Sequence, residues 1–307
     1  MTITLRQLEI FAAVVAHGSF RRCGEALGMS QVSVSDHMRS LEANLGIPLF
    51  ERQSGGPVRL SSAGQRAAAL APDLLAHAGD FVDGVVNEDR AAARPFRVAM
   101  HGFLLRNLGP VVERWNREQP RHILIRSDET EPVALARQVG AGELDAMFFL
   151  SNDGTEAPGS QLVGHEPLGI FVHRDHPLAA LRPATAADLR ATPAVNLSPD
   201  RYLRPLIDRA LHFVGVSPIS SAVETGEFGL ILNSLNRGSG FTCMFHTSTD
   251  LIGPATELVE VQFETPLPAL QIRMLVRRGL RSDALFRVAL RKLAAAICAP
   301  EAAGQPV

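Results

Sequence analysis

Glycine and serine divide the first 46 residues into three short segments, each with the apolar spacing of a helix. In the first segment the apolar side chains at helical spacing are Leu5, Leu8, Phe11, Val14 and Val15. His17-Gly18 ends this helix, and Ser19 is a natural N-cap for the next. The pattern therefore predicts three short helices in succession rather than one long one.

The same signals place the second and third helices. The second helix is expected over 20–27, with Ala26 and Leu27 facing inward and Gly28 at a left-handed C-cap position. Ser30 can cap the third helix. Its apolar stripe, spaced four, three and four before Gly46 ends the helix, consists of Val34, Met38, Leu41 and Leu45. The predicted order is helix, helix, three-residue turn, helix.

The opposite face of the third helix carries the side chains that we expect to meet DNA. They are Ser30, Gln31, Val32, Ser33, Asp36 and Arg39, and Ser40 lies on the same face. In a helix-turn-helix, the N-terminal end of the second motif helix enters the major groove. There Gln can read adenine, Arg can read guanine, and an aliphatic side chain can cover the thymine methyl, which gives an exposed Val32 a use.

Two short extended pieces follow, joined by a glycine-rich turn. Pro48-Leu49-Phe50-Glu51-Arg52 leads through Ser54-Gly55-Gly56 to Val58-Arg59-Leu60. The pattern predicts a wing with one arginine on each side. We therefore expect Arg52 and Arg59 to contact phosphates or the minor groove.

A set of residues in fixed register runs through this whole segment. The set is Leu5-Arg6-Gln7-Leu8, Phe11, Gly18-Ser19-Phe20, Ala26-Leu27, Ser30-Gln31, Ser33, Ser35, Leu41-Glu42, Leu45-Gly46, Pro48-Leu49-Phe50-Glu51-Arg52, Arg59-Leu60-Ser61 and Ala63-Gly64. This order closely resembles the DNA-binding module of LysR-type transcriptional regulators. The resemblance implies a winged helix-turn-helix over residues 1–60. The alternative, a three-helix packing unit with no role in DNA binding, is disfavoured by the wing and the register.

Three positions depart from the family's usual pattern. Val32 stands where the family usually has Pro, Asp36 where it often has a basic or amide residue, and Cys23-Gly24 where Ala is usual. Charge gives no support for DNA binding, since the formal net charge is −2 and residues 1–60 are only slightly basic. Lys292 is the only lysine, however, so the basic groups are nearly all guanidinium, which suits bidentate contacts with phosphate or guanine.

An alanine-rich helix is expected after the wing, over about 61–90. Its apolar stripe, spaced four, four, three and four, is Leu70, Leu74, Ala78, Phe81 and Val85. Gly64 and Pro72 weaken the helix locally. The stripe needs a partner, so we expect the same helix of a second subunit, which would also bring two DNA-reading modules to two half-sites. The alternative is packing on the chain's own sensor domain.

Residues 91–307 show alternating strand and helix patterns after a polar, Ala-rich hinge. The expected strands are Phe96 to Met100, Ile123 to Ile125, Ala146 to Leu150, Leu168 to Val172, Ala194 to Leu197, Phe241 to Met244 and Ile272 to Val276. Strands separated by helices imply a parallel sheet layered with helices. Two motifs also resemble the LysR-type effector domain: Gly142-Glu143-Leu144-Asp145 before a strand, and Asn236-Arg237-Gly238-Ser239-Gly240-Phe241.

That second resemblance implies an α+β multidomain chain that ends in two α/β lobes similar to a type 2 periplasmic binding protein, with a ligand cleft between them. In open parallel sheets ligands bind off the carboxyl ends of strands, where helix N-termini point. The residues expected to bind an effector there are His101, Gly102, Phe103, Thr130, Asn196, Ser198, Arg201, Thr225 and Thr247. Hydroxyls and helix N-termini favour a small polar or anionic ligand, with Arg201 or Arg204 as a carboxylate clamp.

Each of these assignments has a simpler alternative. Any of the Ser and Thr residues can be a helix N-cap, and His101 can be a packed, hydrogen-bonded histidine. Glu129 and Glu224 oppose a simple anion site unless an arginine pairs with them. Cys243 on a buried strand could sense oxidants, but no second cysteine is near it in sequence, and packing is the favoured explanation.

The sequence also excludes some classes of function. It contains no GxSxG, P-loop, HExxH or complete GxGxxG motif, so an enzyme is not expected, and we expect no cofactor beyond a small organic effector. Cys23, Cys243 and Cys298 form no metal-binding cluster. We expect a cytoplasmic homodimer that pairs into a homotetramer. Its expected partners are double-stranded operator DNA and an effector, with RNA polymerase as a further candidate and no membrane. Lobes that serve only assembly stay a second alternative.

Overall fold

The structure is a computed structural model that describes residues 3–51, 58–86, 94–127, 131–217, 220–246 and 257–299. It separates into two compact units. The first holds Met1–Pro95 with two short segments, Arg137–Asp145 and Arg277–Asp283, and the second holds the rest of the chain. The N-terminal helices lie in the first unit and the sheets in the second.

Three short helices open the first unit, as the sequence predicts. They are α1 (Leu5–His17), α2 (Phe20–Leu27) and α3 (Gln31–Leu45). The Ser19 and Ser30 side chains accept hydrogen bonds from the Arg22 and Ser33 amides, and both serines are N-caps. The helices end at Gly18, Gly28 and Gly46, whose φ angles of 61°, 64° and 69° are left-handed. The predicted caps are all confirmed.

The interior of this helical unit differs from the expected faces at two points. Leu5 was expected inside but is 49% exposed, because α1 buries Gln7, Ile10, Phe11 and Val14 instead. On α2, Ala26 is exposed and the buried pair is Cys23 and Gly24. A Cβ on Gly24 would lie 2.6 Å from the Met29 carbonyl oxygen, so α2 approaches the turn closely at this glycine.

The wing begins and ends with paired backbone. Phe50 and Leu60 form an antiparallel bridge, and the Glu51 amide donates to the Arg59 carbonyl at 2.9 Å. The two extended pieces therefore pair as predicted, while the turn between them, with Arg52, lies outside the described residues.

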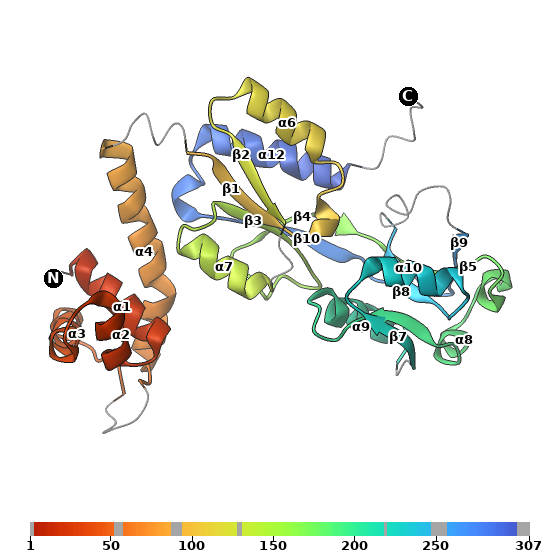
Figure 1. Ribbon diagram of the computed structural model, residues 1–307, viewed down its shortest axis with the longest axis horizontal. Coiled ribbons are helices and arrows are strands. Elements are labelled where there is room, and N and C mark those ends of the chain that lie inside the picture. Colours follow the sequence, from red (N-terminus) through yellow and green to blue (C-terminus); the bar gives the residue numbers. More distant parts are fainter. Residues whose placement is uncertain are drawn as a thin grey trace. The chain divides into compact units, whose positions relative to one another are not determined.

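The long helix α4 (Ser62–Val86) follows directly (Figure 1). Its first turns pack on α1, where Ala63 and Ala71 join the buried core of the helical unit. Pro72 lies inside the helix without ending it. Further along, the large apolar side chains are exposed in the single chain: Leu70, Leu74, Phe81, Val82 and Val85.

The second unit begins with a five-stranded sheet in the order β2-β1-β3-β10-β4. Its strands are β1 (Phe96–Met100), β2 (Ile123–Ser127), β3 (Ala146–Ser151), β4 (Gln161–Glu166) and β10 (Leu270–Val276). Helices α6 (Gly109–Glu118) and α12 (Ala284–Cys298) pack side by side along it (Figure 1). Helix α7 (Pro132–Gly140) connects β2 to β3. We call this sheet and its helices the first lobe.

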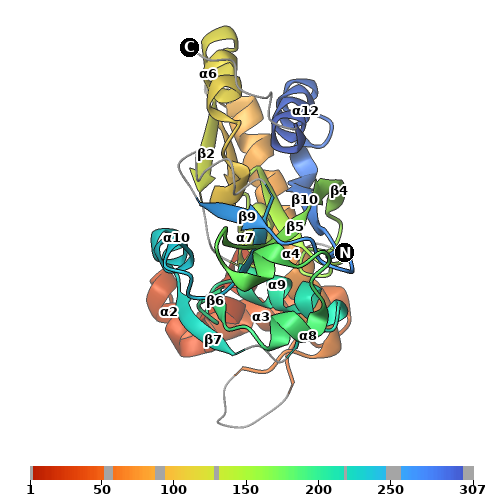
Figure 2. The same cartoon turned by 90° about the vertical axis from the view of Figure 1, so that its right-hand side faces the viewer.

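The second lobe contains a sheet in the order β8-β5-β9. It also contains the parallel pair β6-β7 (Figure 2). Its strands are β5 (Leu168–His173), β6 (Ala194–Leu197), β7 (Ser221–Thr225), β8 (Thr242–Phe245) and β9 (Leu258–Glu260). Its helices are α8 (Ala186–Arg190), α9 (Leu203–Phe213) and α10 (Phe228–Asn236). Short 3-10 turns lie at Gly102–Leu104 (η1), Pro177–Ala180 (η2) and Arg278–Leu280 (η3).

The expected parallel sheet is only partly correct. All seven predicted strands are present, but among the strands that the structure describes only β1-β2, β1-β3 and β6-β7 form parallel ladders. Strand β10 runs antiparallel to β3 and β4, and β5 runs antiparallel to β8 and β9. The chain leaves the first lobe after β4 and returns before β10, so the returning strand enters the sheet in the opposite direction. Strands β4, β7 and β9 were not predicted.

Candidate DNA-binding surface and effector site

The N-terminal half of α3 exposes the side chains that the sequence assigns to base reading. Val32 is 68% exposed, whereas the next valine on this helix, Val34, is completely buried. Gln31 is exposed beside it, Ser33 is half-buried, and Ser30 is the N-cap. An apolar side chain held in water at the end of a helix otherwise packed on a core fits contact with a thymine methyl.

Ser40, on the expected DNA face, has an internal role instead. Its hydroxyl accepts a hydrogen bond of 2.9 Å from the Gln7 side chain amide on α1. Gln7 is buried and its other end completes the capping box of Thr4. Ser40 therefore fixes α3 against α1.

The remaining charged residues of this face pair with each other. Arg39 Nη1 lies 2.8 Å from Asp36 Oδ1, and both side chains are largely exposed. The pair gives the middle of the reading helix no net charge. An exposed pair of this kind contributes little to stability. Its effect is instead on how the helix binds the negatively charged DNA backbone.

Glu42, a residue that the sequence matched to the family without giving it a role, holds the base of the wing. Its Oε1 accepts hydrogen bonds from the Leu49 amide at 2.7 Å and the Phe50 amide at 3.1 Å. These amides begin the first wing strand, so one carboxylate at the end of α3 sets where the wing starts. Arg59 is exposed on the returning strand.

We expect Glu42→Ala to destabilise the helical unit by about 1 to 3 kcal/mol, because two amides then lose a charged acceptor. Glu42→Gln keeps one acceptor oxygen and should lose less. Urea unfolding followed by circular dichroism measures both. If the alanine variant unfolds at the wild-type midpoint, water replaces the carboxylate at no cost and Glu42 does not hold the wing.

The predicted effector residues after β1 form an aromatic contact between the lobes. His101 is buried and stacks on Phe103 with ring centroids 5.4 Å apart, and it accepts the Phe103 amide proton through Nδ1. Phe103 meets Phe245 of β8 edge-on at 5.2 Å and Phe228 of α10 at 5.8 Å. Gly102 is exposed, and a Cβ on it would lie 3.6 Å from the Ser127 hydroxyl oxygen. A first-lobe side chain thus reaches into the second lobe.

Tyr202 adds a second connection between the lobes. Its hydroxyl donates to the Leu150 carbonyl at the end of β3, and its ring lies 5.8 Å from that of His101. Burial raises the pKa of Tyr202 well above its ordinary range, so the phenol keeps its proton. Sequence reasoning missed Tyr202, Phe228 and Phe245, because nothing in their local pattern distinguishes them from core residues.

On the second lobe, the predicted residues after β6 and β7 lie together. The Ser198 amide donates to the Thr225 carbonyl at 2.9 Å. The Thr225 hydroxyl accepts from the Glu227 amide at 3.1 Å, which is a local turn bond. Thr225 is not the helix N-cap of its simpler alternative, because Glu227 is the N-cap of α10. Asn196 directs its amide to the Ser221 hydroxyl at 3.1 Å. Thr130 and Thr247 lie outside the described residues.

The two arginines proposed as carboxylate clamps, Arg204 and Arg201, have different surroundings. Arg204 is paired with Asp208 at 2.8 Å and Glu224 at 3.2 Å. Hydrogen bonds from Ser221 and Arg204 lower the pKa of Glu224, so its charge is both present and matched by an arginine. Arg201 instead lies over Gly226, where a Cβ would be 2.6 Å from its Nε.

A small cavity lies beside some of these groups. A cavity of about 30 Å³ lies beside Phe103, with Asn196 and Phe245 among its lining residues. Cys243 also lines it, and burial and the charge of Asp208 raise the pKa of its thiol, so the thiolate that reacts with oxidants is disfavoured. The structure therefore supports the packing explanation for Cys243.

A winged three-helix unit that leads through a long helix into two α/β lobes defines a DNA-binding regulator with a sensor domain. The family model described as "Bacterial regulatory helix-turn-helix protein, lysR family" matches residues 5–65, and the model described as "LysR substrate binding domain" matches 90–297. The chain belongs to the LysR family of transcriptional regulators. It is a DNA-binding regulator with an effector-binding domain.

Relatives of known description are similar along most of the chain. A "Probable hydrogen peroxide-inducible genes activator" of Streptomyces viridosporus is 26% identical over 302 residues, covering 96% of this chain and 93% of the relative. A "Probable RuBisCO transcriptional regulator" of Cyanidioschyzon merolae is 27% identical over 245 residues, covering 78% of this chain and 80% of the relative.

Solved structures show the same fold. A full-length OxyR variant of Pseudomonas aeruginosa superposes with a TM-score of 0.59 at 22% identity, covering both chains completely. Full-length BenM gives 0.54 at 24% identity, covering 96% of this chain and 95% of BenM. CbnR in complex with its target DNA gives a TM-score of 0.53 at 20% identity, covering 96% of this chain and 100% of CbnR.

Two further observations concern membrane-spanning helices and metal sites. No helix within the described ranges has the length and hydropathy needed to cross a membrane. Among the described residues, no three or more His, Cys, Asp or Glu side chains are gathered to hold a metal ion.

Proposed function

We propose that this regulator works as a homodimer whose two α3 helices read operator half-sites, and whose output is set by a small polar or anionic effector bound between the lobes. We further propose that it acts in the cytoplasm without catalysing a reaction or holding a cofactor. The observation that carries the DNA-reading part is the exposed Val32 at the N-terminal end of α3, beside an exposed Gln31.

The proposed dimer rests on the stripe of α4. Leu74 is 55% exposed and Phe81 is 70% exposed, with Val85 at 67% on the same side of the helix. Leucine and phenylalanine so exposed at spacings of three and four match the seam of a helix pair. Two dimers can pair into a tetramer, and RNA polymerase is the partner through which such a regulator would act on transcription.

The test of operator recognition begins with the DNA adjoining the protein's own coding region. We expect a near-palindrome there to be protected from nuclease cleavage by the dimer, with half-sites about one helical turn or a multiple apart. Protection of no discrete site in that region or in sites selected from random DNA would contradict sequence-specific binding.

Asp36 is expected to weaken binding to DNA of any sequence. In Asp36→Asn the repulsion from phosphate disappears and Arg39 loses its ion partner, so non-specific affinity should rise and its salt slope should steepen by about one unit. If Asp36 also accepts from cytosine N4, discrimination at one base pair should shrink by about 1 to 3 kcal/mol. Salt titrations on operator and random DNA measure both, and equal curves for the two proteins would refute the proposed role.

The proposed effector site uses the groups at the strand ends of both lobes. His101 and Phe103 border it from the first lobe, and Ser198, Thr225 and Arg201 border it from the second. The proposed clamp for a carboxylate is Arg201, whose guanidinium lies over Gly226 at the end of β7. The cavity beside Phe103 has a volume of about 30 Å³, so a ligand that enters there requires the lobes to separate or Phe103 to move.

For a carboxylic acid found by a thermal-shift screen, Arg201→Gln should weaken binding about tenfold or more while operator binding in the absence of ligand is unchanged. Arg209→Gln on α9 is the matched control, because Arg209 is an exposed arginine paired only loosely with Asp153 at 3.5 Å. Calorimetry measures both variants. Equal losses in the two would point to a general charge effect and remove Arg201 from the site.

A second function is favoured by one observation, the volume of about 30 Å³ beside Phe103. Lobes locked together by Phe103 and Tyr202 could serve assembly alone, with no effector. The same screen separates the two functions. A ligand that raises the melting temperature and changes operator affinity supports sensing, whereas no response across a broad set of metabolites supports assembly.

A further inference from the structure

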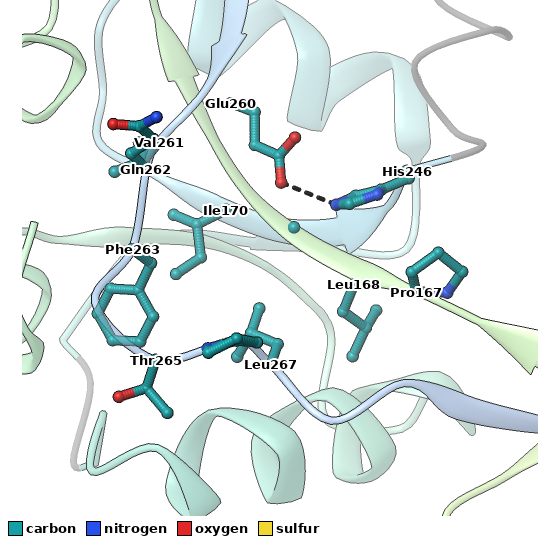
Figure 3. Close-up of a pocket in the computed structure, with 12 residues that line it drawn as sticks. Pro167, Leu168, Ile170, His246, Glu260, Val261, Gln262, Phe263, Thr265 and Leu267 are labelled. Atoms are coloured by element: carbon teal, nitrogen blue, oxygen red, sulfur yellow. Dashed lines mark hydrogen bonds and ion pairs between the residues drawn. The ribbon is translucent and has the colours of Figure 1, made fainter. Parts of the chain in front are cut away.

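A cavity of about 430 Å³ lies against β5 of the second lobe, but its polar and apolar residues lie on different faces of the strand (Figure 3). His246 and Glu260 pair at its edge, 2.8 Å apart, and both side chains are exposed. They lie over Gly169, whereas the neighbouring Leu168 and Ile170 point to the opposite face of β5. The pair and the apolar residues therefore do not form one binding site.

A strong positive charge is concentrated near the end of the chain. Residues 277–299 contain six basic residues and one acid, Asp283, which gives this segment a formal charge of +5, whereas the whole chain carries −2. Residues 1–60, which include the DNA-reading helix, contain six basic and five acidic residues and so carry only +1. A charge gathered in this way indicates a negatively charged partner.

Helix α12 holds half of these basic residues on its outer side. The helix is fixed on the sheet by its buried stripe, in which Phe286 stacks on Phe96 of β1 with ring centroids 4.4 Å apart. On the opposite side of the helix, Arg287, Arg291 and Lys292 are exposed. We call these three side chains the basic face. It lies on the first lobe, away from the residues assigned to the effector site (Figure 1).

The basic face is not neutralised by the chain itself. Within the described residues, none of its three side chains forms an ion pair, whereas Arg114 on the neighbouring helix α6 pairs with Glu118 at 3.2 Å. Arg287 and Arg291 stand four residues apart, and like charges at this spacing destabilise a helix slightly. The stability of α12 therefore does not explain why these residues are basic.

We propose that the basic face is an auxiliary DNA-contact surface, which binds phosphates of the DNA that flanks the operator. A guanidinium group binds phosphate through two parallel hydrogen bonds. Arg287 and Arg291 lie about 6 Å apart along the helix axis, so each can contact its own phosphate. Contacts of this kind do not read bases, and the face therefore accepts flanking DNA of any sequence.

DNA is favoured over an acidic protein because the chain is a DNA-binding regulator. The inference rests on operator binding by the N-terminal unit, as proposed above. Once the operator is bound, the phosphates of its flanks are present at high effective concentration, which makes a few additional contacts count. On bulk DNA three charges alone bind weakly, so the basic face acts mainly after the operator is found.

The test compares two duplexes that contain an operator selected from random DNA, one ending at the operator and one extended on both sides by arbitrary sequence. With the full-length protein at low salt, the extension should raise affinity about tenfold or more and steepen the salt slope. Arg287→Gln with Arg291→Gln should lose most of this gain, and its slope on the extended duplex should flatten by about two units for each contacting subunit. Its affinity for the short duplex should stay unchanged.

Two variants serve as controls. Arg182→Gln with Arg190→Gln removes the same charge from the second lobe, where both arginines are exposed and bond backbone carbonyl groups, and should keep the gain. Arg287→Lys with Arg291→Lys keeps the charge of the basic face and should keep most of the gain. A gain that survives in the Gln variant of the basic face overturns the proposal, as does an equal loss in the second-lobe variant.

Lys292 tests the position of the contact directly, because it is the only lysine in the chain. An amine-acylating reagent therefore labels a single side chain, and that side chain lies on the basic face. The extended duplex should slow acylation of Lys292, measured by mass spectrometry of its peptide, and the short duplex should not. Equal rates with both duplexes overturn the proposal.

Two further outcomes separate this proposal from its alternatives. If the Gln variant binds both duplexes like the wild type but transcription from the operator falls, the basic face binds an acidic protein, and the DNA assignment is wrong. If no operator can be selected, the proposed operator reading fails, and protection of Lys292 by a random duplex at low salt tests the basic face by itself. Unchanged acylation on that duplex overturns the proposal.

Discussion

Gly64→Ala should destabilise the DNA-binding unit by about 3 kcal/mol, at the upper end of what overpacking costs. A Cβ on Gly64 would overlap the Leu49 carbonyl oxygen and lie 3.0 Å from its carbon. That carbonyl is also the acceptor for the Ser61 amide at 2.9 Å, and the Leu49 side chain is buried. Because the Leu49 backbone is fixed by this hydrogen bond and by its buried side chain, it cannot move away easily. The wing and α4 must therefore separate to admit the methyl group.

The same helix provides the control. Gly79 is exposed on α4 and a Cβ there meets nothing within 4 Å, so Gly79→Ala should stabilise the helix by up to about 1 kcal/mol. Urea unfolding measures both, and operator binding should weaken only in Gly64→Ala. Equal stability of the two variants would mean that α4 shifts to accommodate the methyl group and that the close approach to Leu49 is not required.

The double variant Leu74→Asp with Phe81→Asp should be monomeric and should bind its operator about 100-fold more weakly or worse, because the second half-site contact is lost. Both side chains are more than half exposed in the single chain. Two carboxylates on a helix seam face their copies in the partner and repel them. Light scattering gives the mass, and titration of operator DNA gives the affinity.

Gln65→Asp with Ala69→Asp adds the same charge to exposed residues of α4 on the side away from the seam, and should stay dimeric. If the seam variant keeps the mass of the control, the dimer interface lies on another element. If both variants become monomeric, the added charge, and not its position, disrupts assembly.

The N-terminal unit could be predicted almost residue by residue because its signals are local. Ser19, Ser30 and the three left-handed glycines act within one turn of where they stand, so helix bounds follow from neighbouring residues. The sequence did not predict correctly which individual side chains face the interior. Ala26 and Leu5 are exposed because the inner face is decided by which residues of other helices come close, such as Met29 against Gly24.

The lobes were less predictable for the same physical reason. A buried strand such as β3 is predicted by its run of apolar residues. Strands β4 and β7 carry polar residues and β9 has three residues, so the sequence does not predict them. Strand direction depends on pairings between distant segments, which local patterns do not carry. Likewise, Arg204 and Arg201 look alike in sequence. In the structure Arg204 pairs with Asp208 and Glu224, whereas Arg201 lies over Gly226.

The ion pair on α3 bears on how the protein searches a genome. A reading helix that carries its own counterion offers little to the phosphates of random DNA, since Arg39 must leave Asp36 before it can contact them. Bulk chromosomal DNA then competes weakly for the protein, and a larger share of it stays available for the operator. Cells could thus keep few copies of this regulator and still occupy the site, provided that the matched bases repay the separation of the pair.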